Sequence, residues 1–218
     1  MKQHIIFTAA LLLLPLLSFA QENGLSNRVT LSYELMNLDW MNEDDAASVA
    51  KGISAGYARM TQVGPRSGIF IEYGGKLAWL HRVKKGGYMG YTTYRSNFLN
   101  ASLAVNAARP FYMRGKDFAI SPFFGPNLKF NLIGKHKETW ESKDGWHNRR
   151  TNYLSRDERY PAKIFQFGLN IGAGFTFRNL YASYTFQPDL SKYRDGGIYE
   201  GQFECTTNTN VFSVGYCF

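Results

Sequence analysis

The chain has 218 residues and a formal net charge of +8, and its length suits one domain or one barrel better than two domains. Aromatic residues make up 16% of the sequence and glycine occupies 21 positions, while the mean hydropathy is −0.31. These values disfavour long apolar helices and are typical of apolar residues spread through alternating strands. Because no nucleic-acid motif accompanies the basic charge, we predict no nucleic-acid partner.

The first 20 residues have the pattern of a cleaved signal peptide. Lys2 precedes an apolar run over residues 5–17, and small residues lead up to a cleavage position after Ala20. The apolar run is shorter than the roughly 20 residues that a membrane-spanning helix needs. We therefore predict a signal peptide over residues 1–20 and one exported domain over residues 21–218.

Apolar residues alternate with polar or small residues in eight segments of the exported part. In the clearest segment, residues 165–177, every second residue is apolar and the residues between are Gln, Gly, Asn and Thr. This pattern predicts strands with one apolar face, and the segment is long enough for a tilted strand to cross a membrane. The predicted strands lie within residues 29–35, 53–57, 69–79, 99–105, 120–132, 165–177, 180–186 and 212–218.

Short and long connections alternate between these segments, which is typical of a barrel inserted from one side of a membrane. Pro122 and Pro126 interrupt the fifth segment, so we expect a bulge or a late strand start there. The predicted short turns are residues 61–66, 109–116 and 178–179, and the predicted long outer loops are residues 38–50, 81–96, 134–162 and 187–210.

The composition of the polar face of the predicted strands indicates whether the inside or the outside of the barrel faces water. A soluble barrel carries its apolar residues inside, whereas a membrane barrel carries them outside. Here the polar face is rich in Gly, Asn, Ser and Thr, as expected of a narrow lumen, and the few charges are of both signs. We predict an all-β fold, a closed antiparallel transmembrane β-barrel of about eight strands in up-and-down meander order. The charged residues predicted to pair inside the lumen as a plug are Glu34, Glu72, Lys76, Lys129 and Arg178.

Aromatic residues gather near the ends of the predicted strands. Such clusters favour two girdles at the membrane interfaces, although aromatic residues also prefer strands in general. The predicted outer girdle consists of Trp40, Trp79, Tyr94 and Phe98, and the inner girdle of Phe111, Tyr112, Phe118, Phe177, Tyr216 and Phe218.

The last seven residues end on phenylalanine and place an apolar or aromatic residue at every second position. With the signal peptide and the alternating strands, this terminal segment resembles the small outer-membrane β-barrel proteins of Gram-negative bacteria, especially the PorT-like group of Bacteroidota. The resemblance covers the whole exported part in pattern, and the last strand is its one sharp motif. It implies a location in the outer membrane and recognition by the barrel-assembly machinery during biogenesis. The residues that match the assembly signal are Phe212, Val214, Tyr216 and Phe218.

Basic residues gather in two of the predicted outer loops, and Trp and Tyr residues interleave with them in the longer loop. This combination favours contact with lipopolysaccharide phosphates or with an unknown protein partner, because Arg supplies paired hydrogen bonds and aromatic rings supply contact area. A solvated loop of mixed charge is an equal alternative. The residues predicted for this contact are Arg82, Lys84, Lys85, Lys135, Lys137, Arg149 and Arg150.

Catalytic chemistry has one candidate in the sequence. His147 is close in sequence to Glu141, Ser142 and Asp144, and this set resembles the His, Ser and acidic residue of lipid A acyl-modifying barrels. A long polar loop produces such a combination by chance, so we predict no catalytic residue. Residues 43–45 are acidic but lack the spacing of a metal-binding loop, and we predict neither a metal site nor a cofactor.

The sequence therefore predicts a structural or interaction barrel whose lumen is largely plugged and whose outer loops do its work. A small porin-like channel for apolar or small solutes is the alternative, and a lipid A-modifying enzyme is the second alternative. Cys205 and Cys217 are twelve positions apart, which on one extended strand is about 40 Å and beyond the reach of a disulfide.

Overall fold

The structure is a computed structural model, and it describes residues 26–40, 48–64, 67–85, 92–113, 117–142, 145–152, 154, 162–193 and 205–218. The predicted signal peptide lies outside these ranges. All regular elements within them are strands. The same ranges contain no helix long and apolar enough to cross a membrane.

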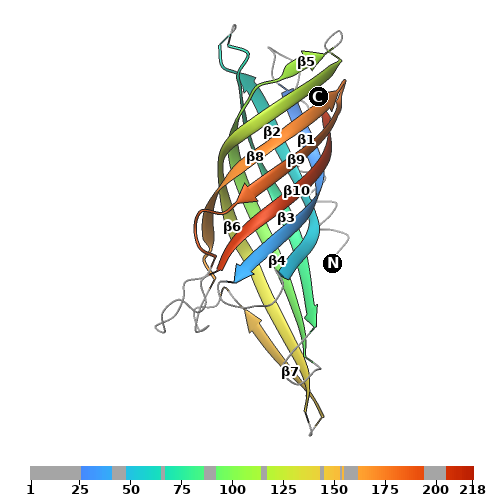
Figure 1. Cartoon of the computed structure of the whole chain (residues 1–218), viewed down its shortest axis with the longest axis vertical. Helices are drawn as coiled ribbons and strands as arrows, with labels where there is room; N and C mark the ends of the chain where they lie inside the picture. The colour runs from blue at the N-terminus through green and yellow to red at the C-terminus, as the bar shows by residue number, and fades with distance from the viewer. Residues whose placement is uncertain are drawn as a thin grey trace, which may run out of the picture.

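Ten strands make up the sheet (Figure 1). Eight of them are 9 to 25 residues long and correspond to the eight predicted segments, while β5 and β7 are additional. Their bounds are β1 Ser26–Trp40, β2 Ser48–Gln62, β3 Phe70–Lys85, β4 Thr93–Ala108, β5 Phe111–Met113, β6 Phe118–Ser142, β7 Gly145–Asn152, β8 Phe165–Phe177, β9 Leu180–Pro188 and β10 Cys205–Cys217.

The sheet closes on itself. The pairing runs in the order β4-β3-β2-β1-β10-β9-β8-β6, and an additional pairing of β4 with β6 completes a ring of eight strands. Every pairing in the ring is antiparallel, and the first and last strands pair along 13 positions, from Arg28 with Cys217 to Trp40 with Cys205. The predicted closed meander barrel is therefore confirmed, and closure leaves no unpaired edge around the wall.

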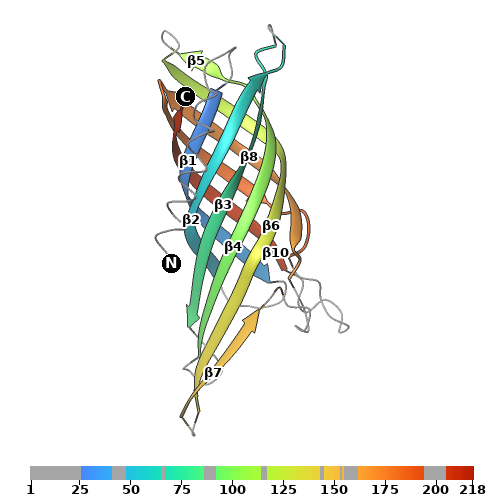
Figure 2. The same ribbon diagram turned by 180° about the vertical axis from the view of Figure 1, so that it is seen from behind.

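The two ends of the barrel differ in their connections. At one end, the short-turn end, strands are joined through residues 63–69, 109–110 and 178–179, and the chain ends there at Phe218. At the other end, the long-loop end, strand β6 continues past the wall and pairs with β7 as a projecting ribbon (Figures 1 and 2). Much of the predicted loop over 134–162 is therefore β-structure, because backbone pairing continues where polar side chains occupy both faces and leave no apolar alternation.

The two prolines of β6 do not produce the expected bulge. Pro122 and Pro126 pair in unbroken register with β8, whereas the ladder with β4 has a gap at Val105 and Asn106. A proline nitrogen has no hydrogen to donate, so the gap falls on the side that faces β4. The register shift between β4 and β6 lies instead beside Leu132, toward the long-loop end.

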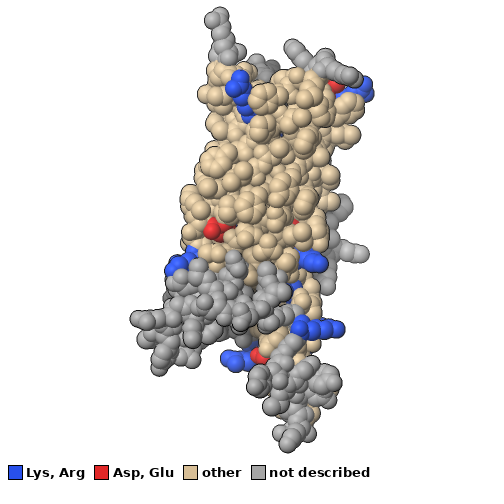
Figure 3. Space-filling model, in the orientation of Figure 1, with Lys and Arg blue, Asp and Glu red and all other residues tan. Residues whose placement is uncertain are grey.

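The outer surface of the barrel is apolar around its whole circumference. Leu77, for example, is 56% exposed and points outward between Ala55 and Ala101 of the neighbouring strands. In Figure 3 the middle of the visible face carries uncharged side chains, and the charged groups lie toward the two ends. Each ring strand contributes an exposed apolar side chain, among them Leu31, Ile53, Leu77, Leu103, Phe124, Phe175, Tyr184 and Val214.

Candidate functional site

The interior of the barrel is polar. Along each ring strand the residues between the outward apolar ones point inward, and most of them are small or polar, as the sequence pattern predicted. The largest polar side chains that are almost completely buried are those of Gln166 and Asn127. Other buried polar residues of the interior are Ser32, Ser54, Ser102, Asn106, Asn170 and Thr185.

Among the described residues, three ion pairs lie inside the barrel, and each joins side chains from different parts of the ring. Arg28 Nη2 is 2.6 Å from Glu72 Oε2, and Lys76 Nζ is 2.5 Å from Glu34 Oε1. The third pair joins Lys129 Nζ to Asp189 Oδ2 at 2.5 Å, and these two side chains are 4% and 0% exposed. Since an unpaired charge in such surroundings is costly, the pairing makes a charged interior tolerable.

Neutral amides connect two of these pairs into one network. Lys76 also donates to Gln187 at 3.0 Å, and Gln187 donates in turn to Asn170 at 2.9 Å. Asn170 donates to Asn106, and Asn106 donates to Glu72 at 3.2 Å. The network thus crosses the lumen from β1 and β3 to β8 and β9.

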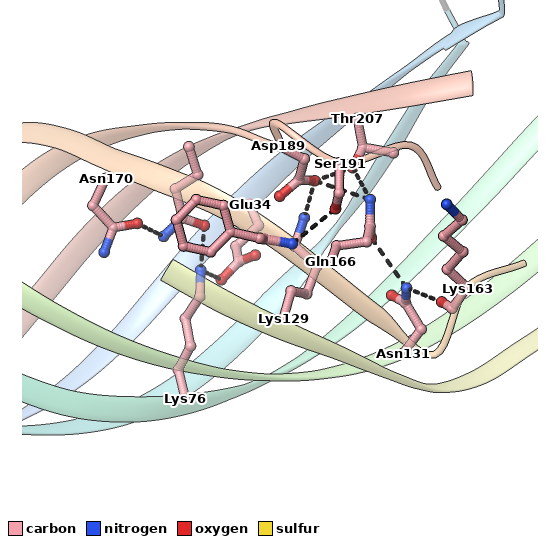
Figure 4. A network of polar contacts seen from close by, with 12 residues as sticks. Glu34, Lys76, Lys129, Asn131, Lys163, Gln166, Asn170, Asp189, Ser191 and Thr207 are labelled. Atoms are coloured by element: carbon pink, nitrogen blue, oxygen red, sulfur yellow. Dashed lines mark hydrogen bonds and ion pairs between the residues drawn. The ribbon is translucent and has the colours of Figure 1, made fainter. Parts of the chain in front are cut away.

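The third ion pair has its own set of partners (Figure 4). Thr207 and Gln166 both donate to the same Asp189 oxygen that binds Lys129. Gln166 also accepts a hydrogen bond from Asn131 at 3.0 Å, and Asn131 donates to the backbone oxygen of Lys163. This cluster ties β6, β8 and β10 to the residue that directly follows β9.

An apolar cluster lies in the interior on the long-loop side of Glu34. Met36 and Leu38 follow Glu34 on the inward face of β1, and both are about 2% exposed. The ring of Phe98 meets that of Tyr193 edge-on, with 6.5 Å between centroids. Phe98 was predicted for the outer girdle, and this was wrong, because it belongs to the inward-facing set of β4. The apolar plug consists of Met36, Leu38, Ala50, Leu80, Phe98, Ala162 and Tyr193.

Cavities remain in the interior of the barrel. A cavity of about 100 Å³ lies among the central polar residues and is lined in part by Asn127. A second hollow of about 350 Å³ lies toward the short-turn end, and Arg28, Tyr181 and Cys217 line it.

Four of the five residues predicted for the lumen charge cluster lie inside the barrel. Glu34, Glu72, Lys76 and Lys129 all take part in interior ion pairs. Arg178 does not: it is exposed in the β8–β9 turn, with positive φ, and its guanidinium lies 5.4 Å from the ring centroid of Phe177.

Sequence reasoning missed two interior partners, Arg28 and Asp189. The alternation of β1 could have placed Arg28 in the lumen, because Arg28 and Glu34 are an even number of residues apart and so share the inward face of the strand. Asp189 carries no comparable signal, because it follows Pro188 in a segment that was predicted to be a loop.

The predicted assembly-signal residues occupy the outward face of β10 at the short-turn end. Phe212, Val214 and Tyr216 are about half exposed or more, and Tyr184 of β9 packs against Phe212 with 5.2 Å between ring centroids. Phe218 is half-buried, and its backbone exchanges hydrogen bonds with Asn27 of β1.

The residues predicted for lipopolysaccharide or partner contact do not lie on one surface. Lys135, Lys137 and Arg150 share the outward face of the β4–β6–β7 sheet. Arg149 is exposed but pairs in register with Glu138 on the opposite face. Arg82 is half-buried on β3 and Lys85 is exposed, while the side chain of Lys84 lies outside the described part.

Of the catalytic candidate, only His147 has a side chain within the described part of the structure. The imidazole of His147 stacks on the indole of Trp140, with 5.5 Å between ring centroids. The register pairs Ser142 with Gly145, and Asp144 lies outside the described ranges. Among the residues that the structure describes, no three His, Cys, Asp or Glu side chains come together as a metal site.

These features define a class of protein: an eight-stranded antiparallel barrel of inverted polarity, with apolar side chains outside and ion pairs inside. No protein-family model matches the sequence, and no curated protein matches it. Several solved structures are similar to the chain at low sequence identity.

Three of these solved structures are small bacterial proteins. The attachment invasion locus protein Ail of Yersinia pestis is 13% identical, covers 88% of this chain and 98% of its own, and has a TM-score of 0.42. Neisserial surface protein A is 11% identical, with coverage of 89% and 98% and a TM-score of 0.42. The outer membrane protein OprG of Pseudomonas aeruginosa is 10% identical, with coverage of 91% and 98% and a TM-score of 0.43. Because these sequence identities and TM-scores are low, the fold assignment rests on the strand pairing of this chain and not on the similar structures.

Proposed function

We propose that the chain is an integral outer-membrane barrel of the PorT-like type of Gram-negative bacteria, exported through a cleaved signal peptide. In this proposal it acts as a structural or interaction protein, without enzymatic activity and without an open pore. The observation that carries the proposal is the combination of an apolar outer wall with an interior that holds ion pairs and an apolar cluster.

The apolar wall supports membrane insertion. Soluble monomers rarely expose contiguous apolar patches larger than a few hundred Å², whereas here every ring strand exposes apolar side chains around the whole barrel. A closed ring of strands also satisfies its backbone hydrogen bonds internally, which the hydrocarbon core demands of any spanning structure. In this proposal the assembly machinery recognises the outward residues Phe212, Val214 and Tyr216 of β10 together with Phe218.

The ion pairs and the apolar cluster inside the barrel favour an interaction protein over a channel. Eight strands enclose a lumen that side chains can fill, and here ion pairs and the apolar plug occupy successive levels of it. The functional surface is then the long-loop end, where basic side chains project beyond the apolar wall. Lipopolysaccharide or a protein of the cell surface is the partner that such a surface suits.

Heat-modifiable migration tests the membrane barrel. We expect the protein, folded into vesicles or detergent without boiling, to migrate faster on a gel than the boiled sample and to give a β-type circular dichroism spectrum. A water-soluble protein with unshifted migration contradicts the proposal and favours a soluble ligand carrier.

Conductance in planar bilayers separates the plugged barrel from the channel alternative. We expect the folded protein to show no sustained open level, because Lys129 and Asp189 and the plug around Phe98 obstruct the lumen. A stable conductance that persists in independently prepared samples contradicts the interaction proposal and supports a channel for small solutes.

A further inference from the structure

We propose that a row of three cations on the outward face of the long-loop end, Arg95, Lys137 and Arg150, binds the phosphate groups of a lipid headgroup in the surrounding leaflet. This inference rests on the proposed function, since it requires the barrel wall to stand in a membrane. Arg95 was not among the residues predicted from the sequence for such contact.

Strand pairing brings the three cations together. Arg95 of β4 lies opposite Lys137 of β6, and Lys137 lies opposite Arg150 of β7. Directly opposed residues of an antiparallel sheet have Cβ atoms about 4.5–5.5 Å apart. The three side chains therefore form a continuous row across three strands, and Lys135, two residues along β6, extends it.

Among the described side chains, no acidic one lies directly beside this row on its own face. The neighbouring outward pairs on either side are Asn97 with Lys135 and Thr93 with Thr139, all of them neutral or basic. The described part of the chain contains no ion pair involving Arg95, Lys137 or Arg150. Like charges directly opposite one another destabilise a sheet, so a bound anion relieves a repulsion that the protein itself leaves in place.

The row lies at the level of lipid headgroups. The last outward row in which all side chains are apolar is Trp79, Leu99 and Ile133, and the cation row follows four residues further along each strand. Four residues span about 13 Å along a strand, which the tilt of a membrane barrel reduces to about 10 Å along its axis. Long Arg and Lys side chains can reach back over this distance into the headgroup layer.

A surface hollow completes the site. Its volume is about 450 Å³, and the cations of the row line it together with Lys135, His136 and two amides. Asn97 also pairs with His81 through a 2.8 Å contact between Oδ1 and Nδ1, which orients its amide. Arg side chains bind phosphate oxygens in paired hydrogen bonds. The amides, from Asn97 and Asn152, add neutral polar groups for the rest of a headgroup.

Native mass spectrometry of the barrel in a neutral detergent tests the site. The probes are diphosphorylated lipid A, the same lipid without its phosphates, and inorganic phosphate. We expect the variant R95Q/K137Q/R150Q to bind the diphosphorylated lipid at least about tenfold more weakly than the parent. The control R109Q/R178Q removes two exposed cations at the short-turn end and should keep the parent affinity.

Equal binding of the diphosphorylated lipid by parent and row variant overturns the inference. Displacement of the lipid by inorganic phosphate at matched phosphate concentration also overturns it, because the site then takes a soluble anion. The parent alone gives a second test: raising the salt should weaken binding only of the phosphorylated lipid. Heat-modifiable migration of the parent protein on a gel is measured in parallel. If the migration of the parent shifts on boiling but its lipid binding does not depend on the phosphates, this inference alone is contradicted. If the migration does not shift, the proposed function is contradicted.

Discussion

Replacing Lys129 with methionine lowers the free energy of unfolding of the barrel by about 3–5 kcal/mol. The substitution removes the ammonium group 2.5 Å from Asp189 and leaves a fully buried carboxylate without its cation. Thr207 and Gln166 still donate to this carboxylate, but neutral donors do not replace a full charge. Urea unfolding in lipid vesicles, followed by heat-modifiable migration, measures the change.

The matched control removes both charges. We expect K129M/D189L to recover most of the stability lost in K129M, because the double variant leaves no buried charge unpaired. A double variant that is as unstable as the single one contradicts the assignment of the cost to an unpaired charge. It would instead indicate that packing around Lys129 dominates.

Replacing Leu77 with arginine lowers the free energy of unfolding in lipid by about 2–4 kcal/mol. Leu77 lies on the outward face of β3, 56% exposed between two alanines, and it belongs to the middle of the apolar wall. In a membrane an arginine here must carry its charge into the hydrocarbon layer. The same unfolding measurement in vesicles gives the magnitude.

Val63 provides the control for this prediction. It is an exposed apolar residue directly after β2, at the short-turn end. We expect Val63→Arg to change the free energy of unfolding by about 0–1 kcal/mol, because charges near the interface cost little. Equal effects at the two positions, or no effect at Leu77, contradict the assignment of the wall to lipid.

Much of the barrel wall was predictable from local pattern. All eight ring strands were predicted, because a strand with one apolar face leaves a period-two alternation that needs no knowledge of its neighbours. The same parity predicted that Glu34, Glu72, Lys76 and Lys129 point into the lumen. The alternation predicted that Arg178 also points into the lumen, and this was wrong, because Arg178 lies in the turn that follows Phe177 and not in the strand.

The sequence by itself determined the alternation, and therefore the strand number and the inward or outward direction of most side chains. Only the tertiary structure decided which side chains meet. Asp189 reaches Lys129, and Phe98 reaches Tyr193, through contacts between residues far apart in the chain. The cation row also depends on register, since Arg95, Lys137 and Arg150 become neighbours only when three strands pair. Register is set by closure of the whole ring and by the bulge beside Leu132, and neither leaves a local signal in the sequence.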